Sequence, residues 1–478
     1  MLSRTLPPLS AALLAGLLAS CAVGPDYERP QSTASDEWLE PAVHGEVDGE
    51  WWASFEDPML TRLIERAIAQ APDIRQATAR LAEARALREA AQGGRLPQVN
   101  ANGSATLNRL SENGQIPVGN IPGFDPEFPL LDAGFDASWE IDLWGRTSRQ
   151  VEQARAREEA ARWGRRDAMV TLTAEIARSY VEFRLAERQL QIADSALSAA
   201  EELSKLTALR FEAGEASRIE ADQAASERAG RQAARDNADA QVAGAAYRLA
   251  TLVGVPPEEI VPELLASSAP IPSPPDAIAS GIRSELLERR PDIRSAEREL
   301  AAATAGIGVA TADLYPRFSL LGSIGLQAQS GDDFTDSGSL RYSAGPSFSW
   351  PIFSFGRIRA QIRAADARAD GAAAAYEAAV MKALSESEAA ANRFAASSAA
   401  LRAHEAALER ERSAFHLAEM RTQQGEASRL ELEQARLRLA NAERQAGEAR
   451  AARASAAVAL YKALGGGWQG AEGLARSD

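Results

Sequence analysis

The 478-residue chain has few of the side chains that build metal or redox sites. Its single cysteine, Cys21, excludes an intramolecular disulfide and a thiolate cluster, and there are only three histidines. Basic residues are in deficit, with 52 Lys and Arg against 67 Asp and Glu and a formal net charge of −15. Phosphate binding needs clustered Lys and Arg. We therefore expect no metal, no other cofactor and no nucleic-acid partner. The sequence also lacks a nucleophile elbow and a phosphate-cradling glycine loop, so we do not expect an enzyme.

Long apolar runs and prolines are scarce as well. Beyond the first 20 residues no stretch of 18 or more apolar residues occurs, so a membrane crossing would have to use strands. No proline lies between Pro129 and Pro256, and none follows Pro351. One helix can therefore run over residues 146–214 and a second over residues 357–425, each about 100 Å long at 1.5 Å per residue.

The start of the chain has the pattern of an exported lipoprotein. Arg4 precedes an apolar stretch over residues 9–18 that is too short to span a bilayer, and small residues lead up to Cys21. This resembles the lipobox of bacterial lipoproteins, in which the cysteine carries a diacylglyceryl group and an acyl chain. The alternative is an ordinary cleavage site with an incidental cysteine. Cys21 is the predicted lipidation site, and Ala22, in place of an Asp, favours the outer membrane.

An internal repeat organises the rest of the chain. Residues 71–75 (APDIR) recur as 290–294 (RPDIR) with an offset of 219, and residues 214–218 (GEASR) recur as 425–429 with an offset of 211. The difference predicts eight extra residues in the first copy, in a surface loop at residues 114–129. The predicted division is 1–20 signal peptide, 21–65 lipid-anchored N-terminal segment with an equatorial part, 66–254 first repeat, 255–288 equatorial linker, 289–465 second repeat and 466–478 tail.

Each repeat reads as helix, strand, strand, long helix and helix. The strands alternate between apolar and polar residues, which suits a half-buried sheet or a barrel with lipid outside and water inside; a soluble β-sandwich edge is the alternative. Along the first long helix, every seventh residue from Met169 to Phe211 is large and apolar except Ser204, and the second helix has a similar series, which predicts a left-handed coiled coil. The predicted lipid-facing residues are Phe135, Trp139, Phe348 and Trp350.

Four strands per chain cannot close a barrel, and an open sheet edge is costly in hydrocarbon. Bacterial barrels begin at about eight strands, and three copies would supply twelve, which leaves an aqueous lumen. We therefore expect a mostly α fold with a membrane β-barrel, built as a homotrimer from a duplicated unit with a long coiled-coil tunnel. This geometry excludes a membrane-spanning monomer more firmly than it excludes a dimer.

Several motifs resemble one family. Residues 21–30 (CAVGPDYERP), the pair Trp51-Trp52 and residues 290–293 (RPDI) are similar to those of the outer-membrane factor lipoproteins of the TolC superfamily, the OprM/NodT branch. The resemblance implies a trimeric twelve-stranded barrel, a twelve-helix tunnel in the periplasm and an equatorial belt. It also implies a passive exit duct for drugs or other small molecules, partnered by a periplasmic adaptor and an inner-membrane pump of the resistance–nodulation–division (RND) type. A protein-secretion duct and a periplasmic adaptor lipoprotein are the alternatives.

The resemblance places the periplasmic gate at the turn after each long helix. A glycine ends the helix there, an apolar residue matches the family's constriction, and carboxylates in three copies would form acidic rings. Arginines could pair with these acids and hold the tip closed; alternatively the acids only complement a helix dipole. Gln223 and Gln434 depart from the family, whose members often carry a pore-lining Asp there. The predicted gate and tip residues are Gly214, Arg218, Ile219, Glu220 and Asp222, and Gly425, Arg429, Leu430, Glu431 and Glu433.

Overall fold

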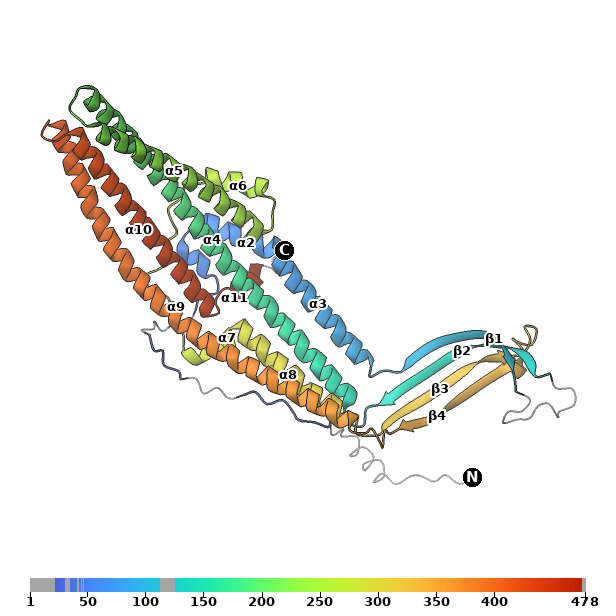
Figure 1. The fold of residues 1–478 in the computed structure, drawn as a ribbon. Coiled ribbons are helices and arrows are strands. Elements are labelled where there is room, and N and C mark those ends of the chain that lie inside the picture. The colour runs from blue at the N-terminus through green and yellow to red at the C-terminus, as the bar shows by residue number, and fades with distance from the viewer. Residues whose placement is uncertain are drawn as a thin grey trace. The chain divides into compact units, whose positions relative to one another are not determined.

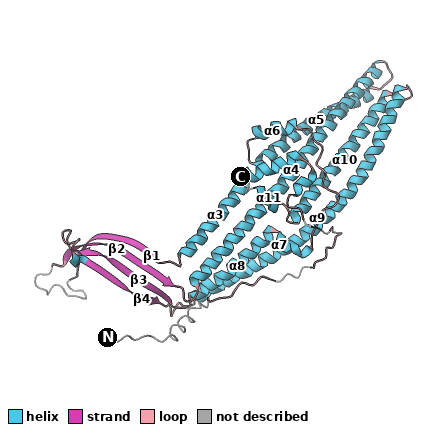
Figure 2. Cartoon of the chain, turned by 180° about the vertical axis from the view of Figure 1, so that it is seen from behind, coloured by secondary structure: helices cyan, strands magenta, loops and turns pink. Residues whose placement is uncertain are grey.

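The computed structural model describes residues 22–30, 35–40, 43, 45, 47–111 and 125–474, and side chains as far as residue 472. The predicted signal peptide, the predicted lipidation site Cys21 and most of the predicted loop at 114–129 lie outside this part of the chain. The described residues are mainly helical, and their strands form one sheet (Figure 1, Figure 2).

The elements follow one another in two similar series. The first comprises α2 (Pro58–Gln70), α3 (Pro72–Gly93), β1 (Gln98–Arg109), β2 (Glu127–Ile141), α4 (Arg146–Glu212) and α5 (Arg218–Val253). The second comprises α7 (Leu286–Arg289), α8 (Pro291–Ala312), β3 (Arg317–Ala328), β4 (Leu340–Ser349), α9 (Arg357–Gln423) and α10 (Arg429–Ala463). The short helices η1 (Trp51–Phe55), α6 (Pro257–Ala266), η3 (Arg283–Glu285), η4 (Ser337–Ser339) and α11 (Trp468–Leu474) complete the described elements.

The duplication predicted from the sequence is visible in the element bounds. α3 and β1 map onto α8 and β3 with the offset of 219, and α4 maps onto α9 with the offset of 211. The strand register follows the same rule, because the pair Gln98–Ser138 maps onto the pair Arg317–Ser349. One detail of the loop prediction was wrong: β2 already begins at Glu127 and contains Pro129. Pro129 is tolerated because β2 has a neighbour on one side only at that point, where it pairs with Leu107.

The four strands form an antiparallel sheet in the order β1-β2-β3-β4, with β1 and β4 at its edges. Successive side chains of a strand point to opposite faces, and paired residues share a face. The pairing therefore collects most apolar residues on one face and most polar residues on the other, with Phe128, Leu130 and Leu321 as exceptions on the polar face. The apolar face includes Phe135, Trp139, Leu320, Ile324, Leu326 and Phe348, and the polar face includes Asn102, Asp132, Asp136, Ser323, Gln327, Arg341 and Ser347.

The described chain divides into two compact units that do not follow the repeats. One unit comprises residues up to 29, 82–160 and 297–375, and contains the sheet. The other comprises residues 30–81, 161–296 and 376 onwards, and holds the largest apolar core. In this second unit η1 packs on α10, with Trp51 stacked on Tyr461 at 5.1 Å between ring centroids. Asp57 caps α2 by accepting from the amides of Met59 and Leu60.

The heptad prediction holds through the middle of α4. Met169, Ile176 and Phe183 are fully buried in the core of the second unit, whereas Phe211, near the end of the helix, is exposed. In α9, Phe394 and Leu408 are buried as well. Among the described residues, no helix combines the length and the apolar composition that a membrane crossing requires.

Candidate functional site

Two turns, α4–α5 and α9–α10, carry the predicted tip residues. Gly214 and Gly425 adopt the left-handed conformation, with φ of 76° and 78°. After Gly214 the next two amides donate to the carbonyl of Arg210, and after Gly425 the next two donate to the carbonyl of Arg421. A glycine is favoured here because it reaches positive φ without a steric penalty. The glycine stop signals read from the sequence are therefore correct.

Each following helix begins with a capping box. The hydroxyl of Ser217 accepts from the Glu220 amide, and the Glu220 carboxylate accepts from the Ser217 amide; Ser428 and Glu431 repeat the arrangement. The backbone hydrogen bond from Ser217 lowers the pKa of Glu220. The carboxylates of Glu220 and Glu431 thus each cap the start of their own helix.

The two tip arginines have different partners, although each is the last residue of the same pentapeptide, GEASR. Arg218 Nε lies 3.4 Å from the carboxylate of Asp222, one turn further along the same helix. Arg429 Nη1 instead lies 3.3 Å from Glu202 Oε1, so it connects α10 to α4. The residue of α9 equivalent to Glu202 is Ser413, which offers no carboxylate. Of the two tip arginines, only Arg429 therefore forms an ion pair between the α4–α5 hairpin and the α9–α10 hairpin.

Glu433, the repeat equivalent of Asp222, differs from the other predicted acids because its side chain is buried, at 5% exposure. Its Oε2 lies 3.0 Å from Arg436 Nη1. Burial raises the pKa of Glu433, the charge of Arg436 opposes this shift, and the neighbouring Glu202 carboxylate adds to it. The proximity of Glu202 could not be predicted from the sequence, because no local pattern marks where α4 and α10 meet; Arg436 lies three residues further along the same helix, within reach of Glu433.

The remaining tip residues lie on the surface of the single chain. Ile219 is 69% exposed and Leu430 is 37% exposed, so neither apolar side chain is covered within one copy. Gln223 and Gln434 are exposed as well. Exposed apolar residues beside a charged cap are available for contacts with another chain.

The predicted lipid-facing residues gather at the sheet. Phe135, Trp139 and Phe348 lie on its apolar face, whereas Trp350 follows the last residue of β4. The two indoles occupy equivalent positions in the repeats and make equivalent bonds: Trp139 Nε1 donates to the carbonyl of Arg95 at 2.9 Å, and Trp350 Nε1 donates to that of Leu314 at 3.0 Å.

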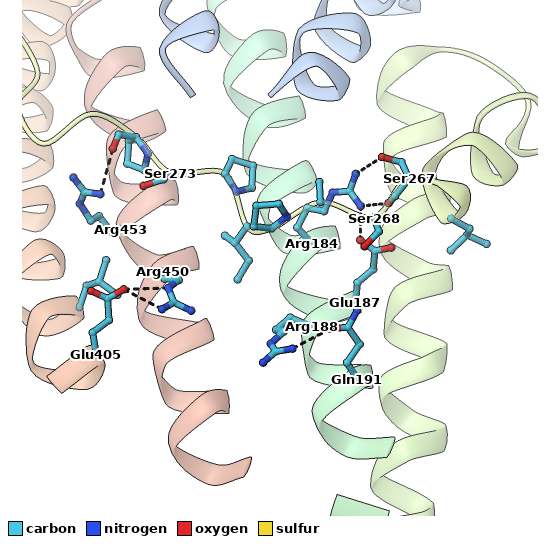
Figure 3. A pocket seen from close by; sticks show the side chains of 17 residues that line it. Arg184, Glu187, Arg188, Gln191, Ser267, Ser268, Ser273, Glu405, Arg450 and Arg453 are labelled. Atoms are coloured by element: carbon cyan, nitrogen blue, oxygen red, sulfur yellow. Dashed lines mark hydrogen bonds and ion pairs between the residues drawn. The ribbon is translucent and has the colours of Figure 1, made fainter. Parts of the chain in front are cut away.

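A pocket of about 660 Å³ lies in the second unit beneath the linker segment 267–275, which crosses from α4 to α10 (Figure 3). Arg184, on α4, donates to the hydroxyl of Ser267 at 2.9 Å, and Arg453, on α10, donates to the carbonyls of Pro274 and Pro275. Both arginines are buried. They hold the two ends of segment 267–275. Each is a charged residue on an otherwise apolar helix face, a pattern that is visible in the sequence.

Among the described residues, no group of three or more His, Cys, Asp or Glu side chains is arranged to hold a metal ion. The two turns carry charged and exposed apolar side chains, and the sheet has one mainly apolar and one mainly polar face.

Comparison with known proteins identifies the fold. The model of the outer membrane efflux protein family matches residues 63–255 and 282–466. The chain belongs to this family. Its members are channels rather than enzymes. The resemblance to the TolC superfamily, the mostly helical fold with strands and the function of an outer-membrane efflux channel are thereby confirmed.

Relatives match this efflux protein over nearly its whole length. The pyoverdine export outer membrane protein OpmQ of Pseudomonas aeruginosa is 32% identical over 486 residues and 100% of both chains. Outer membrane protein OprJ of the same organism is 33% identical over 472 residues and 96% of both chains. The solved structure of the outer-membrane channel OprN is 36% identical, with a TM-score of 0.82 over 94% of this chain and 100% of that one.

Proposed function

We propose that three copies of this chain form the exit channel of a tripartite efflux pump of the RND type. The channel passively conducts drugs or other small molecules from a periplasmic adaptor and inner-membrane pump to the exterior. The family assignment supports this proposal, and the observation that carries the assembly is the sheet, which has two chemically distinct faces and two open edges. Closing these edges between copies gives an apolar outer face and a polar lumen.

The repeat predicts how β4 of one copy pairs with β1 of the next. Within the chain, Asp136 of β2 lies opposite Ser323 of β3. Moving Asp136 forward by the offset of 211 gives Ser347, and moving Ser323 back by the offset of 219 gives Ser104. Ser347 of one copy should therefore lie opposite Ser104 of its neighbour. The same two offsets relate the β1–β2 pairs to the β3–β4 pairs within one chain. The predicted pairing between copies therefore follows a rule that the pairing within the chain obeys.

An exposed phenylalanine supports the same junction. Trp144, in the turn before α4, stacks on Tyr315 at 4.7 Å between ring centroids and donates to the carbonyl of Pro316. Phe355 is the repeat equivalent of Trp144, yet it is fully exposed in the single chain and has a φ of 47°. Leu96, the equivalent of Tyr315, is also exposed. We expect Phe355 to pack on Leu96 of the next copy.

Disulfide trapping tests the channel assembly. The double variant Ser104→Cys with Ser347→Cys should form linked dimers and trimers on a non-reducing gel. A bond within one chain is excluded, because β1 and β4 lie three strand spacings apart, roughly 14 Å. The control pairs Ser347→Cys with Asn102→Cys, which the register places two residues away. Equal trapping in both variants, or none in either, would contradict the proposed register.

The tip residues serve this channel as its periplasmic gate. Arg429 and Glu202 hold neighbouring hairpins together, and Ile219 with Leu430 narrows the passage where three copies meet. In the barrel, Phe135, Trp139, Phe348 and Trp350 face lipid. Relatives named for pyoverdine export and for toluene efflux in Pseudomonas putida support small molecules as cargo. A deletion strain should become more sensitive to such compounds, and unchanged sensitivity to a broad panel would count against efflux.

The N-terminal anchor completes the proposal. Diacylglyceryl and acyl groups on Cys21 hold the chain to the outer membrane, and each buried methylene contributes about 0.8 kcal/mol. The intact mass of the detergent-extracted protein tests this point. We expect acyl mass on each chain of a trimer, and a chain without added lipid mass would contradict the anchor.

A further inference from the structure

Residues 22–29, which follow the predicted lipidation site, bind to a surface of the sheet-containing unit. We call this surface, which includes Arg149, Glu297, Arg298 and Gly308, the seat. At its centre is Arg149, near the start of α4, whose side chain is only 4% exposed. Its guanidinium donates to the carbonyl oxygens of Val23 and Gly24 at 3.2 and 3.3 Å, and to the Asp26 carboxylate at 2.7 Å. A buried arginine that donates three hydrogen bonds to one short segment binds that segment specifically.

The seat also requires close backbone approach. Gly24 has a φ of 93°, and a Cβ added there would lie 2.5 Å from the Cα of Gly308 on α8. A Cβ added at Gly308 would lie 2.8 Å from the carbonyl oxygen of Val23 and 2.8 Å from Cγ of Arg149. The amide of Val23 donates to the carbonyl of Trp144 at 3.1 Å. The segment is therefore in van der Waals contact with α8 at a point where only glycine fits.

The far end of the segment is fastened to α8 by different chemistry. The hydroxyl of Tyr27 donates to Glu297 Oε1 at 3.1 Å, and the Arg298 guanidinium lies 5.2 Å from the centre of the Tyr27 ring. Arg29 adds a longer ion pair to Glu297. Polar, aromatic and backbone contacts thus hold both ends of the segment.

The repeat shows that this seat is not a general property of the fold. The segment lies between α4 of the first repeat and α8 of the second. At the positions related by the repeat offsets, Ala360 replaces Arg149 and Glu89 replaces Gly308. Neither replacement could supply the guanidinium or the close approach, so the seat exists where the chain has an N-terminal segment to fill it.

We propose that residues 22–29 form a docking strap that binds this seat through its own contacts and holds its first residue, Ala22, against the turn between β2 and α4. A Cβ added at Gly145 in that turn would lie 2.6 Å from Ala22, which fixes where the strap begins. The strap sets the point at which acyl chains on Cys21 leave the protein, and this consequence rests on the proposed lipidation. The docking itself is independent of the lipid.

Proteolysis of the full-length, detergent-extracted protein tests the strap. Glu28 is exposed, so a glutamyl endopeptidase can cleave after it when the strap leaves its seat, and the cleavage rate reports the released population. Gly308→Ala should accelerate this cleavage roughly tenfold or more, because the new methyl group collides with the Val23 carbonyl and with Arg149. Arg149→Lys should accelerate it too, because an ammonium on a flexible stem cannot reproduce the fork of donors.

Gly306→Ala is the matched control on the same helix. A Cβ at Gly306 meets only the flexible end of Gln153, so its cleavage rate should equal that of the wild type. Cleavage after Glu426, in the α9–α10 turn, should be unchanged in all variants if the rest of the protein remains folded. Equal cleavage after Glu28 in Gly308→Ala and Gly306→Ala would overturn the proposal.

Cys21→Ser separates the strap from the anchor. The proposal expects this variant to lose the lipid mass and to keep the slow cleavage of the wild type. If Cys21→Ser is cleaved as fast as Gly308→Ala, the acyl chains hold the segment and the seat does not. If the wild type carries no lipid mass, the proposed anchor fails, while the comparison of Gly308→Ala with Gly306→Ala still decides the strap.

Discussion

Arg429 Nη1 lies 3.3 Å from Glu202 Oε1, and this contact joins the first residue of α10 to α4 across 227 positions of the sequence. The equivalent Arg218 pairs within its own helix. The two repeats therefore present the same turn to the solvent but only one of the two arginines ties one hairpin to the other.

Glu202→Gln should open the channel more often than the wild type does. Exposed ion pairs contribute about 0.2–1 kcal/mol each. In the proposed trimer, three pairs of about 0.5 kcal/mol would together shift the ratio of open to closed channels roughly tenfold. Single-channel conductance in planar bilayers measures the effect, and charge reversal by Arg429→Glu should raise conductance further. Arg218→Ala is the control, because it breaks no contact between hairpins. Unchanged conductance in Glu202→Gln would remove this ion pair from the gate.

Glu433→Gln should stabilise the tip at neutral and alkaline pH. Because burial raises the pKa of Glu433 in the folded protein, the ionised form is disfavoured there. The stability that protonated Glu433 contributes is fully present below the ordinary pKa of about 4.3. It is lost as the pH rises through the raised pKa that Glu433 has in the folded protein. We expect the melting temperature of Glu433→Gln to exceed that of the wild type at pH 8 by roughly 1–3 °C, and to match it near pH 4.

Glu220→Gln is the informative contrast, because the pKa of Glu220 is lowered by the Ser217 backbone hydrogen bond. Its stabilising contribution is present above the ordinary pKa and is lost as the pH falls through the lowered, folded value. This variant should therefore be less stable than the wild type at neutral pH and approach it in acid. The same sign of pH dependence in both variants would show that one of the two shifts is misassigned.

Replacing the turn glycines should loosen the tip without crowding it. No described atom lies within 4 Å of a Cβ added at Gly214 or Gly425, so the cost of an alanine comes from its left-handed backbone and is about 1–2 kcal/mol. Hydrogen exchange at the amides of Glu215 and Ala216 should become faster in Gly214→Ala. Gly214→Asn is the control, since asparagine tolerates this conformation better. Equal exchange in the wild type and the alanine variant would contradict the assigned conformation.

Gly325→Ala should impair the sheet. Gly325 and Gly134 are register partners on β3 and β2, and a Cβ at Gly325 would lie 2.6 Å from the carbonyl oxygen of Ala133. Overpacking of this kind costs about 1–3 kcal/mol, so the yield of trimer that resists detergent should fall. Gly322→Ala, whose Cβ would lie 4.0 Å from Ala137, is the control on the same strand. Equal trimer yields would show that β2 and β3 separate more easily than the register indicates.

Much of the fold follows from local signals in the sequence. The absence of proline, the seven-residue spacing and a terminal glycine placed the long helices at residues 146–214 and 357–425, and the structure has α4 end at Glu212 and α9 end at Gln423. Alternation predicted the two faces of the sheet. These features could be read because helix stops, capping and side-chain alternation depend on residues a few positions apart.

By itself, the sequence determined the duplication, the helices, the strands and the two identical turns of GEASR. Only the tertiary structure decided what those turns contact. It paired Arg429 with Glu202, buried Glu433 beside Arg436, and seated residues 22–29 on Arg149 and Gly308. Each of these contacts except that of Glu433 with Arg436 joins segments more than a hundred residues apart. The burial of Glu433 depends on the packing of α10 against α4, so neither a local motif nor the repeat could reveal it.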